Sequence, residues 1–227
     1  MLVLGLIYNK KVGQLKSKIK KIREDFNKYK INFKKLPKDP LNLFSKWIEQ
    51  ALKENKESIA FVLSTVNKQN IPSSRVLLLR GFDKNGFVFF TNFKSAKSID
   101  INNNNNVALI FYWAESQRQV RIVGKAEKIS EKESDNYFNS RPRESQIGAW
   151  ISEQSSVIGL YFKFVNAINE LESKFRGKKI ERPKHWGGYR VKANSMEFWQ
   201  GRPSRLHDRV KYICDNQNNW KKERLAP

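Results

Sequence analysis

The sequence predicts a mainly β protein with flanking helices, an α+β fold. Short runs rich in Val, Ile, Leu and Phe recur from residue 58 onward and predict strands. They cover residues 58–65, 74–82, 86–93, 107–113 and 118–129, and then 188–193, 196–201 and 209–214. Because most connections are short, the strands are expected to form a meander that curls into a barrel. At 227 residues the chain predicts one domain with an appendage.

Two helices are predicted before the first strand. In residues 10–30, apolar side chains recur every three or four positions and Lys fills most of the rest (Val12, Leu15, Ile19, Ile22 and Phe26), so the helix is amphipathic. Its apolar stripe is free to pack on the body, to pair with another chain or to lie on an anionic surface. A second helix begins with Asp39 as N-cap and Pro40 in its first turn.

Turn and capping signals set the order of the remaining elements. Asn85-Gly86 favours a turn with positive φ, so the strands on either side of residues 83–86 should pair as an antiparallel hairpin. A helical turn beginning near Ser95 offers backbone amides to a phosphate. Ser130 and Glu133 have the spacing of a capping box, and a later helix over residues 159–176 stops at Gly177.

The composition excludes several classes of protein. With 44 Lys and Arg against 22 Asp and Glu, the net charge of +22 would attract polyanions, although a lysine- and asparagine-rich codon usage explains it as well. One cysteine, Cys214, allows no intrachain disulfide and favours a reducing, cytoplasmic setting. Cys214 and the two histidines have no zinc-motif spacing, so no metal is expected. The apolar N-terminus is too short to span a membrane.

One stretch, residues 137–155, concentrates groups that bind anions. Arg141 and Arg143 flank Pro142, and hydroxyl and amide side chains follow within one turn and helix (Ser145, Gln146, Gln154 and Ser155). Guanidinium groups form forked, charge-assisted bonds with phosphate, and hydroxyl groups fill the remaining lone pairs. A phosphate site is therefore weighed against an ordinary solvated loop.

The order of motifs resembles the pyridoxine/pyridoxamine 5′-phosphate oxidase family. The matching segments are SRPxxSQIGAWxSxQS at 140–155, EFWQGRxxRLHDR at 197–209 and the terminal RLAP, with RVLLLR at 75–80, TNFKSAK at 91–97, RQVRIVG at 118–124 and DPLNLFSKW at 39–47. Long motifs in one order are specific where a three-residue match is weak. The resemblance covers nearly everything from Arg23 to Pro227.

The resemblance implies an FMN-binding split β-barrel with flanking helices, assembled as a homodimer with one FMN in each of two interface sites. It implies oxidation of pyridoxine or pyridoxamine 5′-phosphate to pyridoxal 5′-phosphate, with hydride passing to FMN and then to O2 to give hydrogen peroxide. Residues 39–227 would form the oxidase domain, and residues 1–38 a basic helical extension that includes a lid over the substrate. Arg23 aligns loosely with that lid.

Residue roles follow from the resemblance position by position. The positions expected to contact FMN are Arg75, Val76, Leu77, Leu78, Leu79, Arg80, Phe90, Thr91, Lys97, Gln119, Gln154, Ser155, Trp199 and Arg209. Those expected to contact the substrate are Arg80, Tyr137, Arg141, Ser145, Arg205 and His207, of which Arg205 and His207 are the catalytic pair. Arg205 and His207 would emerge on the same side of an extended segment, and His207 is a candidate for proton transfer or for positioning.

Two positions depart from the family pattern. Arg80 replaces the usual Lys and keeps the charge in a larger, flatter head group. Ala96 replaces an Arg in the flavin-phosphate loop, and the loss of one charge-assisted bond predicts FMN affinity weaker by roughly ten- to hundredfold.

Two other functions remain open at this point. A split-barrel carrier of FMN or pyridoxal phosphate would keep the fold and lack the activity, although a carrier has less need of Arg205 and His207. A nucleic-acid binder would explain the charge, but the aromatic residues lie in apolar strand runs and do not alternate with Lys as stacking platforms. The expected partners are therefore small molecules and O2, with no nucleic acid and no membrane.

Overall fold

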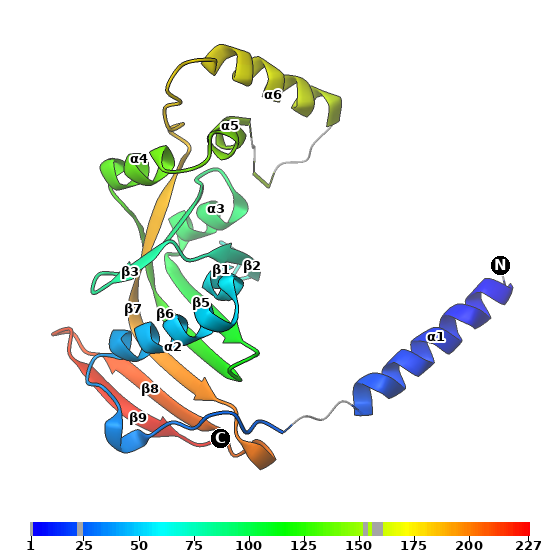
Figure 1. Ribbon diagram of the computed structural model, residues 1–227, viewed down its shortest axis with the longest axis vertical. Coiled ribbons are helices and arrows are strands. Elements are labelled where there is room, and N and C mark those ends of the chain that lie inside the picture. Colours follow the sequence, from blue (N-terminus) through cyan, green and yellow to red (C-terminus); the bar gives the residue numbers. More distant parts are fainter. Residues whose placement is uncertain (1, 22–24, 152–153, 156–160) are drawn as a thin grey trace.

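The computed structural model describes residues 2–21, 25–151, 154–155 and 161–227. Its centre is one nine-stranded antiparallel sheet with the path β2-β1-β5-β6-β7-β4-β3, to which β8 and β9 are added beside β7 (Figure 1). The predicted α+β class is confirmed. The strands are β1 (Ala60–Val66), β2 (Pro72–Leu78), β3 (Gly81–Asp83), β4 (Gly86–Asn92), β5 (Asn106–Trp113), β6 (Arg118–Lys128), β7 (Trp186–Gln200), β8 (Asp208–Cys214) and β9 (Trp220–Leu225).

The strands differ from the sequence prediction in three places. The run at 74–82 is two strands, and the short β3, not β2, forms the hairpin with β4, while β2 pairs with β1. The runs at 188–193 and 196–201 belong to the single strand β7, which passes through an irregularity opposite Val123/Gly124. Gly124 is required there because a Cβ would lie 2.1 Å from the carbonyl oxygen of Lys192. The last strand, β9, was not predicted.

The helices begin largely where the capping signals indicate. The helices are α1 (Leu2–Lys21), α2 (Pro40–Glu54), α3 (Ala96–Asn103), α4 (Glu131–Asn139), α5 (Arg143–Ile151) and α6 (Tyr161–Phe175), with 3-10 turns η1 (Phe33–Lys35), η2 (Lys56–Ile59) and η3 (Pro203–Arg205). Asp39 caps α2 by accepting the Leu41 amide at 2.8 Å. The capping box of Ser130 and Glu133 is present at α4, and Gly177 after α6 has φ of +69°.

The N-terminal region corrects the predicted helix over residues 10–30. The helix α1 ends at Lys21, and Ile22 lies outside the described residues. Phe26 lies in a non-helical segment, residues 25–38, that runs along the barrel. Its backbone is held by side chains of a distant turn and a distant strand: Gln117 Oε1, between β5 and β6, accepts the Asn27 amide at 3.0 Å, and Asp208 Oδ2, on β8, accepts the Ile31 amide at 3.1 Å.

The core is aromatic and lies between α2 and the sheet. The ring of Phe44, fully buried on α2, packs edge-on against Phe82, Phe87 and Phe111 at centroid distances of 4.9, 5.0 and 5.2 Å. A smaller cluster around Phe138 and Trp186 joins α4 and α5 to the end of β7. These two clusters fix the elements that carry the site.

Candidate functional site

A pocket of about 470 Å³ lies between β2, β4, α4, α5 and the start of β7. Its walls are Val76, Leu77, Leu78, Arg80, Phe90, Thr91, Asn92, Tyr137, Arg141, Ser145, Gly148, Ala149, Gln154 and Trp186. Ten of these positions were predicted from sequence. The lining residues come from segments up to about a hundred residues apart in the chain, which the fold brings together in one cavity.

Three stacked rings form one wall of the pocket. Phe90 stacks on Tyr137 at 3.8 Å and on Trp186 at 5.5 Å between ring centroids. Arg141 lies over the face of Trp186, with Cζ 4.6 Å from the ring centroid. The sequence analysis missed Trp186, which lies two residues before the predicted strand at 188–193. The contact with Arg141 explains how a loop arginine is held at the pocket.

Arg141 is a cation without a full set of partners. Its Nη1 atom is buried and forms no hydrogen bond with any described residue. Burial lowers the pKa of Arg141, and the positive charge of Arg80 acts in the same direction, whereas Tyr137 opposes both. Buried donors of this kind are nearly always satisfied, so an unsatisfied guanidinium nitrogen on a residue that lines the pocket is consistent with a site for an anion.

A second cationic group lies beside the pocket, at the start of α3. Lys97 is buried, and its Nζ donates to Thr91 Oγ1 at 3.1 Å, Gln154 Oε1 at 3.0 Å and Ser95 Oγ at 3.0 Å. All three acceptors are neutral. Burial, reinforced by the positive charge of Arg75, lowers the pKa of Lys97 to about 8.

Arg75 and Ser155 complete this group. Arg75 donates to Thr65 Oγ1 at 2.7 Å, and Thr65 in turn donates to Asp100 Oδ2 at 2.7 Å. The Oγ of Ser155 accepts the Ala96 amide at 3.3 Å, at the first turn of α3. Burial lowers the pKa of Arg75, while Asp100 partly offsets that effect. No ion pair joins Arg75, Arg80, Lys97 or Arg141 to a carboxylate within the part of the chain that the structure describes.

Arg143 has a different task from its neighbour. It donates through Nη1 to the Lys178 carbonyl at 3.1 Å and through Nη2 to the Phe175 carbonyl at 2.5 Å, so it caps the C-terminal end of α6. Of the two arginines in residues 137–155, Arg141 therefore lines the pocket and Arg143 has a structural role.

The remaining predicted positions form a separate group at the other end of the molecule. Gln119 on β6 faces Trp199 on β7, and Trp199 faces Arg209 on β8 in the register of the sheet. The ring of His207 lies 4.7 Å from Trp199 and 5.9 Å from Phe26. We call Phe26, Trp199 and His207 the aromatic cluster. None of these residues lines the pocket, and α4 and α5 lie at the opposite end of the long axis from β8 (Figure 1).

Three predicted positions have surroundings that the sequence did not indicate. Leu79 is a core side chain, 6% exposed, packed in the main hydrophobic cluster. Arg209 is bound by Glu197 Oε1 at 2.8 Å and by the Ala226 carbonyl at 2.8 Å. Arg205 lies in η3 with φ of +60°, next to Ser204 at +54°. The segment is therefore a tight turn, and the argument that an extended segment would place Arg205 and His207 on one side was wrong.

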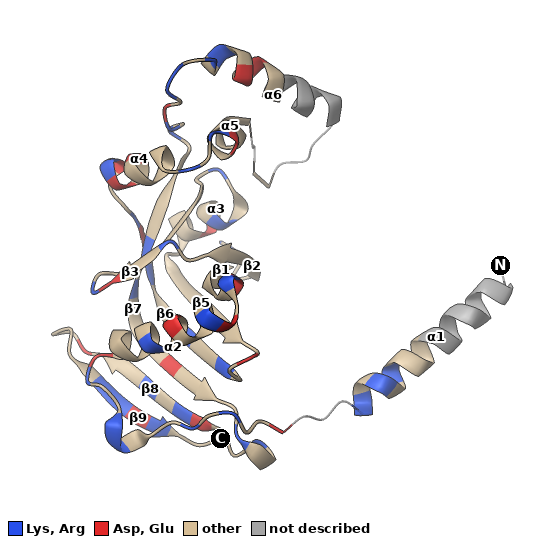
Figure 2. Cartoon of the chain, viewed as in Figure 1, with Lys and Arg blue, Asp and Glu red and all other residues tan. Residues whose placement is uncertain are grey.

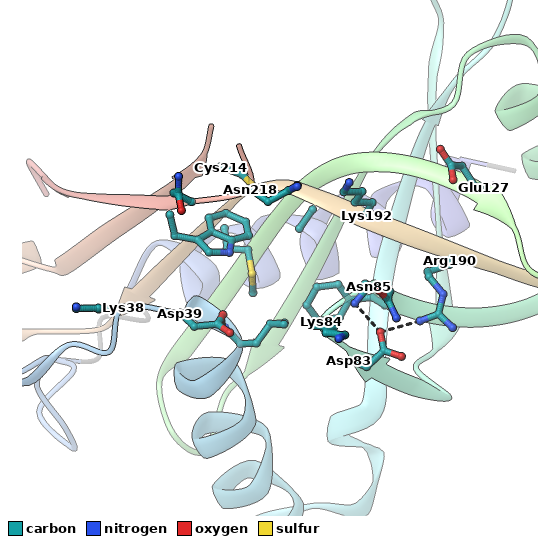
Figure 3. Close-up of a pocket in the computed structure, with 17 residues that line it drawn as sticks. Lys38, Asp39, Asp83, Lys84, Asn85, Glu127, Arg190, Lys192, Cys214 and Asn218 are labelled. Carbon is teal, nitrogen blue, oxygen red and sulfur yellow. Dashed lines mark hydrogen bonds and ion pairs between the residues drawn. The ribbon is translucent and has the colours of Figure 1, made fainter. Parts of the chain in front are cut away.

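A larger cavity, of about 950 Å³, lies elsewhere and contains no predicted site residue. It opens where β7 leaves β4 and joins β8, between the turns that precede β4 and β9 (Figure 3). Its arginine is already paired, since Arg190 Nη1 lies 2.8 Å from Asp83 Oδ1. Lys38, Lys84 and Lys192 are exposed at its rim. This cavity is a gap between two hairpin turns and lacks the buried, unpaired cation of the smaller pocket.

The described residues show neither a metal-binding cluster nor a membrane-spanning helix. In the described ranges, no three His, Cys, Asp or Glu side chains come together as a metal site. None of the helices within those ranges is long and apolar enough to cross a membrane. Lys and Arg are spread over most elements, with a local concentration in the last turn of α1 (Figure 2).

The fold defines a class of protein, the split β-barrels with flanking helices. Residues 48–174 match the family described as pyridoxamine 5′-phosphate oxidase, and residues 186–227 match the pyridoxine 5′-phosphate oxidase C-terminal dimerisation region. The chain belongs to the pyridoxamine 5′-phosphate oxidase family.

Individual proteins agree with this assignment. A pyridoxine/pyridoxamine 5′-phosphate oxidase of Microcystis aeruginosa is 45% identical over 207 residues, which are 91% of this chain and 97% of that protein. The crystal structure of PhzG from Burkholderia lata, in complex with tetrahydrophenazine-1-carboxylic acid, has a TM-score of 0.82 at 28% identity and covers 88% of this chain and 100% of that one. An FMN-binding, oxidase-related protein of Nostoc punctiforme has a TM-score of 0.69 at 16% identity, covering 83% and 98%, and supports the fold.

Proposed function

We propose that the protein oxidises pyridoxine 5′-phosphate and pyridoxamine 5′-phosphate to pyridoxal 5′-phosphate, with FMN as cofactor and O2 as final acceptor. The observation that carries the proposal is the set of cations in and beside the pocket that form no ion pair with a carboxylate of the described residues, above all the half-buried Arg141 with its unsatisfied Nη1. Two phosphorylated ligands, FMN and the substrate, would supply the missing anions. Family membership and the printed names of relatives support the same reaction.

The residues present fit FMN. Arg75 and Lys97 would hold its phosphate together with Thr91, Gln154, Ser155 and the first amides of α3. The side chains of β2, Val76 to Leu78, would lie against the flavin, since they form one wall of the pocket. When bound, FMN supplies the two-electron chemistry, which no amino-acid side chain can provide.

Substrate binding is assigned to the residues above the flavin site. Tyr137, Arg141 and Ser145 would hold the 5′-phosphate of the substrate, and Arg80 would add a fourth donor group. Arg141 presents its free Nη1 to the phosphate, so binding would satisfy a buried donor and would also neutralise a desolvated charge. This is why a phosphate is expected and a neutral ligand is not.

A second subunit would bring the aromatic cluster to the pocket. In one chain the pocket and the aromatic cluster lie apart, and both are needed to hold a phosphorylated ring. Apolar side chains of the sheet are exposed in the single chain: Val76 is 65%, Tyr112 58% and Val123 47% exposed. Together with the matched dimerisation region, these observations support a homodimer in which each site takes its phosphate pocket from one subunit and Gln119, Trp199, Arg205, His207 and Arg209 from the other.

Two further assignments belong to this proposal. Residues 39–227 form the oxidase domain, while residues 1–38 form a basic helical extension whose last part lies over the substrate side. The setting proposed for the enzyme is the cytoplasm, in keeping with a single unpaired cysteine.

The direct test is aerobic formation of pyridoxal 5′-phosphate, followed by its absorbance, with FMN-loaded protein and pyridoxine 5′-phosphate. Turnover by the wild type, with kcat/KM reduced in Arg141→Ala and in His207→Ala, would support the oxidase. FMN binding without any turnover would support the carrier of FMN or pyridoxal phosphate instead.

Mixing subunits tests the shared site. Arg141→Ala and His207→Ala subunits are co-expressed with different tags, and activity is measured at a substrate concentration well below the wild-type KM, where each variant alone is impaired. If the two groups come from different subunits, each mixed dimer contains one site that is entirely wild type, and a random mixture recovers about a quarter of wild-type activity. Purified mixed dimers without activity would show that both groups act within one chain.

A further inference from the structure

His207 lies in a turn that fixes which of its two ring nitrogens carries the proton. The backbone N–H of Arg202 donates to Nδ1 of His207 at 3.1 Å. A nitrogen that accepts a hydrogen bond from an amide has its lone pair in the ring plane and no proton. A neutral His207 must therefore carry its proton on Nε2.

The turn that makes this contact is conformationally costly. Ser204 and Arg205 both have positive φ, at +54° and +60°, although neither is glycine. Left-handed conformations of this kind are unfavourable for residues other than glycine and persist where the surroundings determine them. Here they reverse the chain tightly enough for the Arg202 amide to reach the ring five residues later, and the Leu206 amide closes the turn on the Pro203 carbonyl at 3.1 Å.

The charged groups around the ring also oppose a second proton. Burial lowers the pKa of His207, and the positive charges of Arg205 and Arg209 lower it further. The two nearby carboxylates are engaged elsewhere. Asp208 accepts the Ile31 amide at 3.1 Å and lies 3.6 Å from Arg202 Nε and 3.9 Å from Arg224 Nη2, and Glu197 holds Arg209. On its remaining sides the ring contacts Trp199 and Phe26, which carry no charge.

We propose that neutral His207 acts only as a hydrogen-bond donor, through Nε2, to position the substrate ring, and that the Arg202 amide fixes this tautomer by donating to Nδ1. The inference rests on the function proposed above. A donor at Nε2 selects a ligand atom with a free lone pair, such as an oxygen attached to the ring or the nitrogen of a pyridine ring. His207 then takes no proton from the substrate, because its basic nitrogen is turned inward and occupied.

The first experiment measures the tautomer without reference to activity. The chain has two histidines, so selective ¹⁵N-histidine labelling of the full-length protein, with and without FMN, gives two ring systems that the His185→Gln variant assigns. Between about pH 6 and 8, we expect Nδ1 of His207 to resonate as a bare nitrogen and Nε2 as a protonated one. A proton on Nδ1, or on both nitrogens at neutral pH, would overturn the proposal even if the protein turns over substrate.

The second experiment uses two amide replacements as matched variants. The side-chain amide of Gln reaches the place of Nε2, whereas that of Asn is shorter and ends near Nδ1. His207→Gln should keep KM for pyridoxine 5′-phosphate within about threefold, while His207→Asn should raise it about five- to tenfold, as expected for one lost hydrogen bond. Equal KM values in the two variants would contradict a donor at Nε2.

The pH profile separates positioning from proton transfer. If His207 only donates a hydrogen bond, the pH dependence of kcat/KM in His207→Gln keeps the limbs seen in the wild type. A limb that disappears in His207→Gln would show that His207 exchanges a proton with the substrate, and the proposal would fail. A protein that binds FMN but has no turnover refutes the proposed oxidation alone, since the tautomer is still read by NMR.

Discussion

The pocket and the aromatic cluster are built from opposite kinds of chemistry. The pocket collects cations that lack counter-ions, and burial lowers the pKa of Arg75, Lys97 and Arg141 alike. Around the aromatic cluster most charges are matched, since Arg209 pairs with Glu197 at 2.8 Å and Asp208 lies near Arg202 and Arg224. A region with unmatched buried charge is built to receive charge, and a region with matched charge and packed rings is built to orient a ring.

Substitutions in the two regions should also differ in their effects on ligand affinity and on the stability of the ligand-free protein. A desolvated cation without a carboxylate destabilises the empty protein and is stabilised only when an anion arrives. The pocket should therefore lose ligand affinity and gain stability when its cations are removed. In the aromatic cluster, removal of a ring or an ion pair should lower both.

The largest effect is expected for Arg141→Gln. Loss of two or more charge-assisted bonds to the substrate phosphate should raise KM for pyridoxine 5′-phosphate by about a hundredfold or more, because each such bond contributes about 1.5 to 3 kcal/mol. Steady-state kinetics with FMN-loaded protein measure the change.

Arg143→Gln is the matched control, since Arg143 is two residues away and caps the end of α6. It should lower Tm and leave KM nearly unchanged. A KM effect as large for Arg143 as for Arg141 would remove the distinction between the two arginines.

The next effect is expected for Lys97→Met, which removes the buried ammonium group. FMN affinity should fall about ten- to hundredfold, because a charge-assisted contact to the phosphate is lost. The FMN-free protein should unfold at the same or a higher temperature, since a desolvated charge has been deleted. Fluorescence titration of FMN and thermal unfolding give the two readings, with the exposed Lys94→Met as the control.

Lys97 also predicts a pH dependence. Its pKa in the folded protein, about 8, lies below the usual 10.5, so the folded protein binds fewer protons than the unfolded chain between these values. Lys97 therefore destabilises the FMN-free protein fully below about pH 8, and the penalty disappears as pH rises towards 10.5. FMN binding favours the ammonium form, so affinity should decline above about pH 8 in the wild type and remain level there in Lys97→Arg. An identical decline in both proteins would mean that another group titrates.

A smaller effect, in the opposite direction, is expected for Ala96→Arg. Ala96 is exposed at the first turn of α3, beside Ser155. An arginine there should tighten FMN binding about tenfold, as an added charge-assisted contact near the phosphate. Asn102→Arg, at the far end of the same helix, adds the same charge away from the site. Equal gains in both variants would indicate a general effect of charge.

Local signals in the sequence were enough for much of the fold. The α+β class, the N-cap at Asp39, the capping box at Ser130 and the glycine after α6 depend on residues within one turn of each other, and the structure has all of them. The motif order identified the family because it reflects many positions at once. Ten pocket residues could be named for the same reason.

Other features depend on contacts between distant segments, and only the tertiary structure decided them. Phe26 has a helical spacing in the sequence but lies outside any α-helix and packs against Trp199. Gln117 and Asp208, both distant in the sequence, bind the backbone of its segment, residues 25–38. The roles of Arg141 and Arg143 differ because one faces Trp186 and the other faces the end of α6. The tautomer of His207 depends on the positive φ of two non-glycine residues, and no local preference predicts that conformation. Local patterns and motif order were therefore sufficient for most elements and for the family, whereas contacts between distant segments leave Arg141 Nη1 without a hydrogen-bond partner among the described residues and so available to a ligand.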